Sequence, residues 1–229
     1  MISAKGHGRL LTVPFWNFAK GGGGVKSGKP LKILFIRHAE TDYKDIGDCD
    51  NCDGNLTENG EKQCDILGER LKDMPIDGYI TSSLLRAFKT AAGVCRAKAD
   101  KPILEICPEI IECGCTEGYY GCSLEYLERY YGNARMLKNL FGGEKYDFAC
   151  VSVEENALRA EKLVEYIKEN YFFGQCVAVF SHHGMLEYLI PAALGAEEKQ
   201  FSLSLANISV TQVDIYEDGS TELIPDTAE

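Results

Sequence analysis

Short apolar runs alternate with longer amphipathic stretches along most of this chain. The runs at residues 33–36, 78–81 and 176–180 are almost wholly apolar, and residues 102–107 form a fourth, less uniform run. Strands that are buried on both faces of a parallel sheet have this character, because neither face alternates with solvent. The pattern therefore predicts a mostly parallel sheet.

Apolar residues at spacings of three and four predict helices between these strands. The first begins at Thr57, a residue type that caps helix N-termini, and the second covers residues 84–98. The third, at residues 152–171, has the most regular apolar stripe, and Ser152 and Glu155 give it a capping box. Each helix follows a strand, as in β-α-β units.

The last third of the chain completes the pattern. Residues 185–194 predict a helix with a break at Pro191, and the alternating tail from residue 207 to 224 carries an Asp-Gly turn typical of a hairpin. We therefore expect an α/β fold, a three-layer sandwich. Its mostly parallel central sheet has helices on both faces and an antiparallel edge strand near the C-terminus.

A glycine-rich stretch separates the N-terminal region from the rest. "GGGGVKSGKP", residues 21–30, is typical of a flexible linker. We expect residues 1–30 to be a flexible N-terminal extension and residues 31–229 to be a single domain. The segment before the linker contains Pro14 and Asn17 and lacks a clean small-residue cleavage site, so we expect no secretory signal.

The charge balance excludes some partners. The formal net charge is −11, which repels nucleic-acid backbones and anionic membrane surfaces. No apolar run approaches the roughly 20 residues needed to span a bilayer. We expect a cytoplasmic protein without nucleic-acid or membrane partners, and the sequence does not indicate its oligomeric state.

Ten cysteines raise the question of a metal site or of disulfides. Disulfide scaffolds belong to short secreted chains, so reduced thiols fit this chain better. Cys49 with Cys52 and Cys113 with Cys115 could supply four thiolates to zinc, although the second spacing is tighter than usual. A thiolate metal-binding protein therefore remains an alternative.

Basic side chains follow three of the predicted strands. Arg37 and His38 follow the first, Arg86 comes shortly after the second, and His182 and His183 follow the strand at 176–180. Ligands of parallel α/β sheets bind at the carboxyl ends of the strands, so these groups should converge. Converging positive groups repel one another unless an anion lies between them, and a phosphoryl group matches that need.

Four sequence blocks carry a resemblance to a known family. "RHAET" resembles the R-H-G-[ED]-T signature of the histidine phosphatase superfamily, whose members resemble cofactor-dependent phosphoglycerate mutase. "LTENGEKQ" is similar to L-T-x-x-G-x-x-Q, "SSLLRAFKTA" to S-x-L-x-R-A-x-Q-T-A, and "VAVFSHHG" to an apolar strand followed by Ser-His-Gly. The blocks occur in the family's order between residues 32 and 184.

The resemblance implies a role for each basic residue. His38 would be the nucleophile that becomes phosphohistidine, Arg37 and Arg86 would bind the phosphoryl oxygens, and His182 would be the second histidine of the pocket. Arginine and histidine would supply the positive charge, so no metal or other cofactor is expected. A neutral attacking nitrogen on His38 requires its other ring nitrogen to donate to an acceptor such as a backbone carbonyl.

The family also uses a carboxylic acid to protonate the leaving group. "PEIIECGCTEG" offers Glu109, Glu112 and Glu117. The family's L-x-E pattern is best matched by the segment that ends at Glu112, so Glu112 is the first candidate and Glu109 the second. Glu117 resembles a block that shapes the pocket.

The resemblance favours the phosphatase branch. Mutases of this family carry a longer insertion between the acid and the second histidine. The expected activity is hydrolysis of a small phosphorylated metabolite by a phosphatase of the histidine acid phosphatase type. Phosphoglycerate mutase-type transfer and non-catalytic phosphate binding are alternatives. Three departures from the family pattern are Ala39 for glycine, Lys89 for glutamine and His183 for glycine.

Overall fold

The computed structural model describes the backbone of residues 2–6 and 9–13, and residues 28–45, 54–114, 119–143 and 152–226 in full. Its main sheet contains the strands β3 (Leu31–Arg37), β6 (Gly78–Thr81), β7 (Leu104–Ile106), β8 (Ala134–Met136), β9 (Cys176–Ser181), β11 (Val210–Ile215) and β12 (Thr221–Ile224). The helices are α1 (Glu58–Leu71), α2 (Leu85–Ala97), α3 (Leu124–Glu128), α4 (Val153–Asn170), α5 (His183–Leu194) and the short 3₁₀ helix η2 (Pro108–Ile110).

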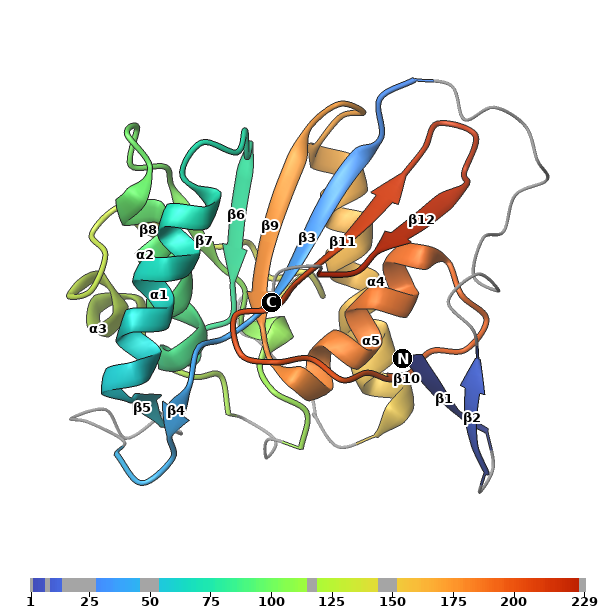
Figure 1. The fold of residues 1–229 in the computed structure, drawn as a ribbon, viewed down its shortest axis with the longest axis horizontal. Coiled ribbons are helices and arrows are strands. Elements are labelled where there is room, and N and C mark those ends of the chain that lie inside the picture. Colours follow the sequence, from blue (N-terminus) through green and yellow to red (C-terminus); the bar gives the residue numbers. More distant parts are fainter. Residues whose placement is uncertain are drawn as a thin grey trace.

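The seven strands are ordered β12-β11-β3-β9-β6-β7-β8 (Figure 1). Strands β3, β9, β6, β7 and β8 are parallel, whereas β11 runs antiparallel to β3 and β12 antiparallel to β11. The carboxyl ends of the parallel strands lie at the lower edge of the sheet in Figure 1. This arrangement confirms the α/β sandwich expected from the sequence, including the antiparallel C-terminal hairpin.

Burial on both faces of the sheet explains the apolar runs. In β3, Ile33 and Phe35 belong to a core formed with α4 and α5, while Leu34 and Ile36 belong to a second core formed with α1 and α2. Both cores continue through the alternating residues of β9. A polar residue at any of these positions would be buried without a partner, so the runs tolerate none.

The helix starts are those expected. The Thr57 side chain accepts a hydrogen bond from the backbone N–H of Gly60 (2.9 Å) at the start of α1. Ser152 and Glu155 form a complete capping box at the start of α4. In contrast, the expected break at Pro191 is wrong, because α5 continues through this residue to Leu194. The surrounding side chains are buried on all sides, and their packing holds the last turn despite one missing backbone donor.

Several short elements have no counterpart in the sequence prediction. These are β8, α3, the hairpin of β4 (Thr41–Asp42) with β5 (Asn55–Leu56), and the N-terminal strands β1 (Ile2–Gly6) and β2 (Arg9–Val13). Strand β1 pairs with β2 and also with β10 (Phe201–Ser202). The flexibility expected for residues 1–30 stays a prediction.

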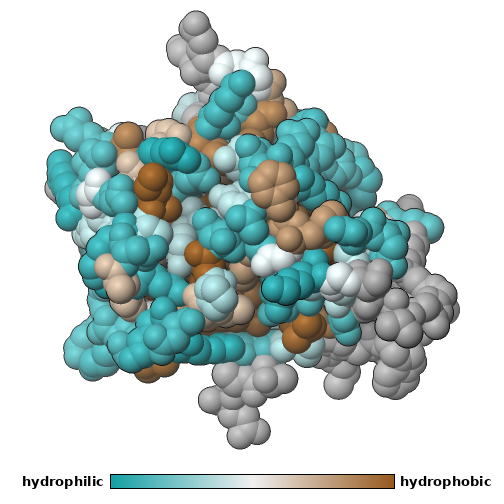
Figure 2. Space-filling view, turned by 90° about the horizontal axis from the view of Figure 1, so that it is seen from above, coloured by the Kyte–Doolittle hydropathy of each residue, from teal (hydrophilic) through white to brown (hydrophobic). Residues whose placement is uncertain are grey.

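Polar side chains dominate one face of the molecule (Figure 2). The face shown in Figure 2 is largely hydrophilic, with hydrophobic residues in small separated groups. Within the described ranges, no helix is both long and apolar enough to cross a membrane.

Truncating β3 should destabilise the fold. Ile33→Ala removes a side chain that is 0% exposed, so the free energy of unfolding should fall by about 2–5 kcal/mol. Urea denaturation followed by circular dichroism measures the change. Ile66→Ala, at a position 61% exposed, is the matched control and should change stability by less than about 1 kcal/mol. Equal losses in the two variants would contradict the assigned core.

Candidate active site

The strand order brings distant parts of the sequence to one edge of the sheet. Strand β9 lies between β3 and β6, and Arg37 at the end of β3 is the register partner of Ser181 at the end of β9. His38 follows β3 and His182 follows β9. Parallel strands end at the same edge, so these side chains, and Arg86 in the first turn of α2 after β6, meet there.

His38 is buried and held in one tautomer. Its Nδ1 lies 2.7 Å from the carbonyl oxygen of Ala39, while its Nε2 accepts a hydrogen bond from Arg86 Nε at 3.3 Å. A guanidinium can only donate, so Nε2 carries the lone pair and Nδ1 carries the proton. The carbonyl acceptor expected for the second ring nitrogen is therefore present, and the Nε2 lone pair points toward the arginine.

His182 faces His38 from the start of α5. The two ring centroids are 5.2 Å apart, and His182 is 0% exposed. Its Nε2 is 2.8 Å from the hydroxyl of Ser82, while its Nδ1 is buried without a hydrogen-bond partner among the described residues. A buried polar atom without a partner is costly, so a bound ligand would offset this cost.

The two arginines complete the cluster. Arg86 is 2% exposed, and its guanidinium carbon lies over the ring of Tyr43, 5.4 Å from the ring centroid. Arg37 donates through Nη1 to the carbonyl of Leu205 at 2.6 Å, and its buried Nε has no partner within the described part of the chain. The cluster also lies at the N-terminus of α2, where backbone N–H groups favour an anion.

Burial keeps both histidines neutral. Burial, followed by the positive charge of Arg86, lowers the pKa of His38 from 6.5 to about 3. The same two causes, in the same order, hold the pKa of His182 well below its ordinary value. Neutral imidazoles and cationic guanidinium groups are thus combined in one site. Such a site offers a nucleophilic nitrogen next to a binding place for phosphoryl oxygens.

Helix α1 holds the loop that carries His38. The backbone N–H of Glu40 donates to Gln63 Oε1 (2.7 Å), and the N–H of Thr57 donates to the carbonyl of Glu40 (3.1 Å). A Cβ at Gly60 would collide with that same carbonyl oxygen. The threonine, glycine and glutamine of "LTENGEKQ" therefore act together on one loop.

A second support comes from α2. The N–H of Ala39 donates to Thr90 Oγ1 at 3.0 Å, and Thr90 donates in turn to the carbonyl of Arg86 at 2.7 Å. Asn207 donates to the carbonyl of His38 at 2.8 Å. The main chain on both sides of the His38 ring is thus fixed by side chains from α2 and the loop before β11.

The candidate acids have different environments. Glu109 is 0% exposed and accepts from the N–H of Leu140 (2.7 Å), and burial raises its pKa. Glu112 instead lies at the start of α5, where Oε1 accepts from the N–H of Met185 at 3.1 Å. That helix start also carries His182, so the geometry favours Glu112 over Glu109. Glu117 lies outside the described residues.

The departures from the family pattern are accommodated. Ala39 is fully buried, and Lys89 forms an ion pair with Glu61 and donates to Asn55 at 3.0 Å. His183 is the first residue of α5, and its side chain is 38% exposed and lies 3.8 Å from Glu187. His182, rather than His183, is therefore the histidine buried beside His38.

The cysteines of the described segments show no metal site. No group of three or more His, Cys, Asp or Glu residues that could hold a metal occurs in these segments. Burial raises the pKa values of the Cys64, Cys95, Cys107 and Cys176 thiols. Cys49, Cys52 and Cys115 of the alternative zinc site lie outside the described residues.

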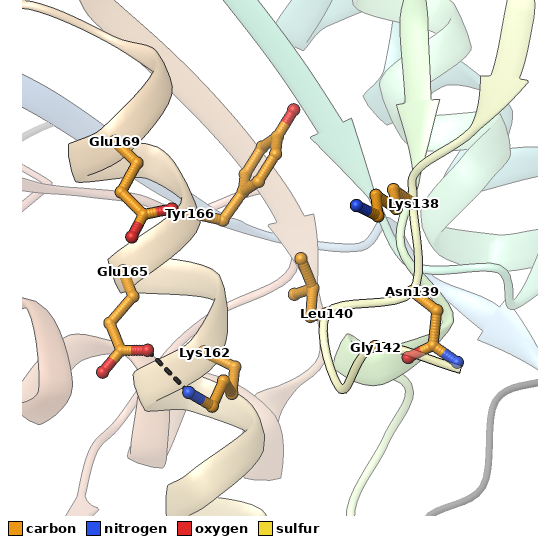
Figure 3. A pocket seen from close by; sticks show the side chains of 8 residues that line it. All are labelled: Lys138, Asn139, Leu140, Gly142, Lys162, Glu165, Tyr166 and Glu169. Atoms are coloured by element: carbon orange, nitrogen blue, oxygen red, sulfur yellow. Dashed lines mark hydrogen bonds and ion pairs between the residues drawn. The ribbon is translucent and has the colours of Figure 1, made fainter.

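A separate pocket lies between α4 and the loop after β8 (Figure 3). Its volume is about 300 Å³, and Lys138, Lys162, Glu165 and Tyr166 are among the residues that line it. Lys162 and Glu165 pair with each other at 2.8 Å. None of the four clustered basic residues lines this pocket, so it is distinct from the histidine site.

A comparison with known protein families matches the part of the chain that contains the clustered residues. The model of the histidine phosphatase superfamily (branch 1) matches residues 33–224. The chain belongs to this superfamily. The match includes both histidines, both arginines and the candidate acids, so the superfamily assignment and the geometric cluster concern the same part of the chain.

Two curated relatives are similar over most of their length. A probable phosphatase of Schizosaccharomyces pombe is 27% identical over 201 residues, covering 83% of this chain and 90% of that protein. Phosphoserine phosphatase 1 of Hydrogenobacter thermophilus is 27% identical over 192 residues, covering 82% and 88%. Among solved structures, a mycobacterial glucosyl-3-phosphoglycerate phosphatase has a TM-score of 0.60 at 21% identity, covering 87% and 99%. The last likeness shows the superfamily fold.

Sequence reasoning missed several supporting residues. Ser82 and Thr90 stand within the quoted block "SSLLRAFKTA", so the block itself was a signal. Asn207 lies in an ordinary loop, and Arg159 lies on a helix where a charged residue normally faces solvent. Neither of these two gave a sequence signal.

The two buried histidines should resist protonation. In the free protein, the His38 ring should stay neutral between about pH 8 and pH 4, because its pKa is lowered to about 3. Histidine ring nitrogen shifts measured by NMR across this range test the expectation, with the urea-unfolded chain as the control. Titration of His38 near its ordinary value in the folded protein would contradict the burial described above.

The same shift links stability to pH. The unfolded chain binds this proton near pH 6.5, whereas the folded chain does not until about pH 3. The stability associated with the neutral His38 ring is therefore fully present above pH 6.5. As the pH falls from 6.5 toward 3, only the unfolded chain gains the proton, so the free energy of unfolding should decrease.

Proposed function

We propose that this protein is a phosphomonoester hydrolase of the histidine acid phosphatase type that acts through a phosphohistidine intermediate. The observation that carries the proposal is the unprotonated Nε2 of His38, buried beside Arg86 and facing His182. This nitrogen is a nucleophile, and the Nε of Arg37, which has no partner among the described residues, is a donor for a phosphoryl oxygen.

In the first half-reaction, His38 Nε2 attacks phosphorus and a P–N bond forms while the P–O bond to the leaving group breaks. Arg37 and Arg86 balance the charge on the phosphoryl oxygens, which supplies most of the catalysis in such transfers. The leaving alkoxide takes a proton from the carboxylic acid of Glu112 and departs as an alcohol.

The second half-reaction restores the enzyme. Glu112, now a carboxylate, accepts a proton from a water molecule whose oxygen attacks phosphorus. The P–N bond breaks, its electron pair returns to His38 Nε2, and inorganic phosphate is released. The hydrogen bond from Nδ1 to the carbonyl of Ala39 keeps the ring in the same tautomer throughout.

The proposed substrate is a small phosphorylated metabolite. The names of two relatives, a phosphoserine phosphatase and a glucosyl-3-phosphoglycerate phosphatase, support a phosphorylated hydroxyl group on a small organic molecule. We also propose that the protein acts in the cytoplasm. The thiols of the buried residues Cys64, Cys95, Cys107 and Cys176 support this, because reduced cysteines persist in a reducing compartment.

Replacing the nucleophile should abolish turnover. His38→Ala removes the attacking nitrogen, so release of phosphate from a panel of phosphomonoesters should fall to the background rate. Parent enzyme that is quenched with a denaturant at alkaline pH should carry acid-labile phosphate on His38, detectable by mass spectrometry without an acid step. A parent without turnover on any monoester would favour phosphate binding alone. Phosphate transfer from a bisphosphate primer to 3-phosphoglycerate would favour the mutase alternative.

The acid has its own test. Glu112→Gln should reduce kcat/KM for alkyl phosphates by about 10²–10⁴-fold, the usual contribution of general acid catalysis. Glu109→Gln is the matched control, because Glu109 faces Leu140, and its loss of activity should be much smaller in variants that remain folded. The reverse order of effects would assign the role to Glu109.

A further inference from the structure

The guanidinium of Arg159 is buried outside the histidine cluster. Arg159 lies on α4 and is 0% exposed, although charged side chains on helices normally reach solvent. Removing a guanidinium from water is costly unless its donors are well paired. The buried guanidinium of Arg159 therefore needs a hydrogen-bond acceptor for each of its donor nitrogen atoms.

Those acceptors belong to the segment just before Glu112. Arg159 donates through Nε to the carbonyl of Glu109 and through Nη2 to the carbonyl of Ile111, both at 2.6 Å. The carbonyl of Ile111 is part of the peptide bond to Glu112. The planar guanidinium thus fixes the main chain immediately before the candidate acid. Asn156 accepts from Nη1 at 2.7 Å and orients the group from its own helix.

The same guanidinium also reaches the other side of the acid. Its Nη2 lies 3.4 Å from the sulfur of Met185, and the backbone N–H of Met185 donates to Glu112 Oε1. Gly184 donates to Oε2 at 3.4 Å, and a Cβ at Gly184 would lie only 2.7 Å from Oε1. The Glu112 side chain therefore rests closely on a helix start that Arg159 also contacts.

We propose that Arg159 is a positioning residue that holds the general acid Glu112 in place for protonation of the leaving group. This inference rests on the function proposed above. A lysine could not reproduce the contact, because two carbonyls and one amide oxygen are bound by three different nitrogen atoms of a planar fork.

The role predicts a dependence on the leaving group. An alkoxide leaves slowly without a proton, whereas 4-nitrophenolate is stable as an anion and needs little help from an acid. Displacing the acid should therefore slow the hydrolysis of alkyl phosphates much more than that of 4-nitrophenyl phosphate. A general loss of structure would slow both esters by a similar factor.

The experiment compares kcat/KM for 4-nitrophenyl phosphate and for the best alkyl phosphate of the panel. Arg159→Lys and Arg159→Met are each expected to lose about tenfold or more with the alkyl ester and less than about threefold with the nitrophenyl ester. Circular dichroism and thermal unfolding report whether each variant is folded. If Arg159→Met does not fold, Arg159→Lys, which keeps the charge, carries the comparison.

Lys98→Met is the matched control. Lys98 is also a buried cation that binds backbone carbonyls, those of Leu71 (2.6 Å) and Met74 (2.5 Å), but at the end of α1. Its loss should reduce stability and leave the ratio of the two kcat/KM values unchanged. A ratio that changes equally in the Lys98 and Arg159 variants would overturn the proposal.

A double variant tests whether Arg159 acts through Glu112. Because Glu112→Gln already removes the transferable proton, adding Arg159→Lys should slow alkyl ester hydrolysis by less than about twofold more. Additive losses, or equal losses on both esters, would overturn the positioning role while an active parent leaves the proposed function intact. A parent inactive on every monoester would overturn both.

Discussion

A local shortage of negative charge around His38 is the constraint on which this structure depends. The chain as a whole is strongly acidic, yet Glu40, two residues after His38, and Glu109 are engaged elsewhere. Glu40 accepts hydrogen bonds from Thr57 and Asn59, which lower its pKa, and Glu109 turns toward Leu140. Neither neutralises the cluster, so an anionic ligand is left as its counter-charge.

The order of the strands creates this concentration of charge. His38, Arg86 and His182 are far apart along the chain, but they follow the adjacent strands β3, β6 and β9. The two apolar cores fix these strands, and α1, α2 and α4 each contribute one set of hydrogen bonds to the loops at the strand ends. The core and the site are therefore built from the same elements.

The fold was largely predictable from the sequence, because its signals are local. Apolar runs marked four of the parallel strands, and caps at Thr57 and Ser152 marked two helix starts. The rule that ligands bind at strand ends, with the four motif blocks, selected Arg37, His38, Arg86 and His182, and the structure brings them together. Short strands such as β8 were missed, since three residues carry too little pattern.

The parts of the site that could not be predicted depend on side-chain direction. Glu109 and Glu112 are three residues apart, and only the turn through η2 sends one toward Leu140 and the other toward α5. Arg159 is a charged residue of the kind that normally faces solvent. Its burial follows from the packing of α4 against that turn. Gly60 has a related consequence for engineering. The space between α1 and the Glu40 carbonyl admits only a hydrogen atom, so no larger side chain, however conservative in polarity, could occupy this position without displacing the loop that bears the nucleophile.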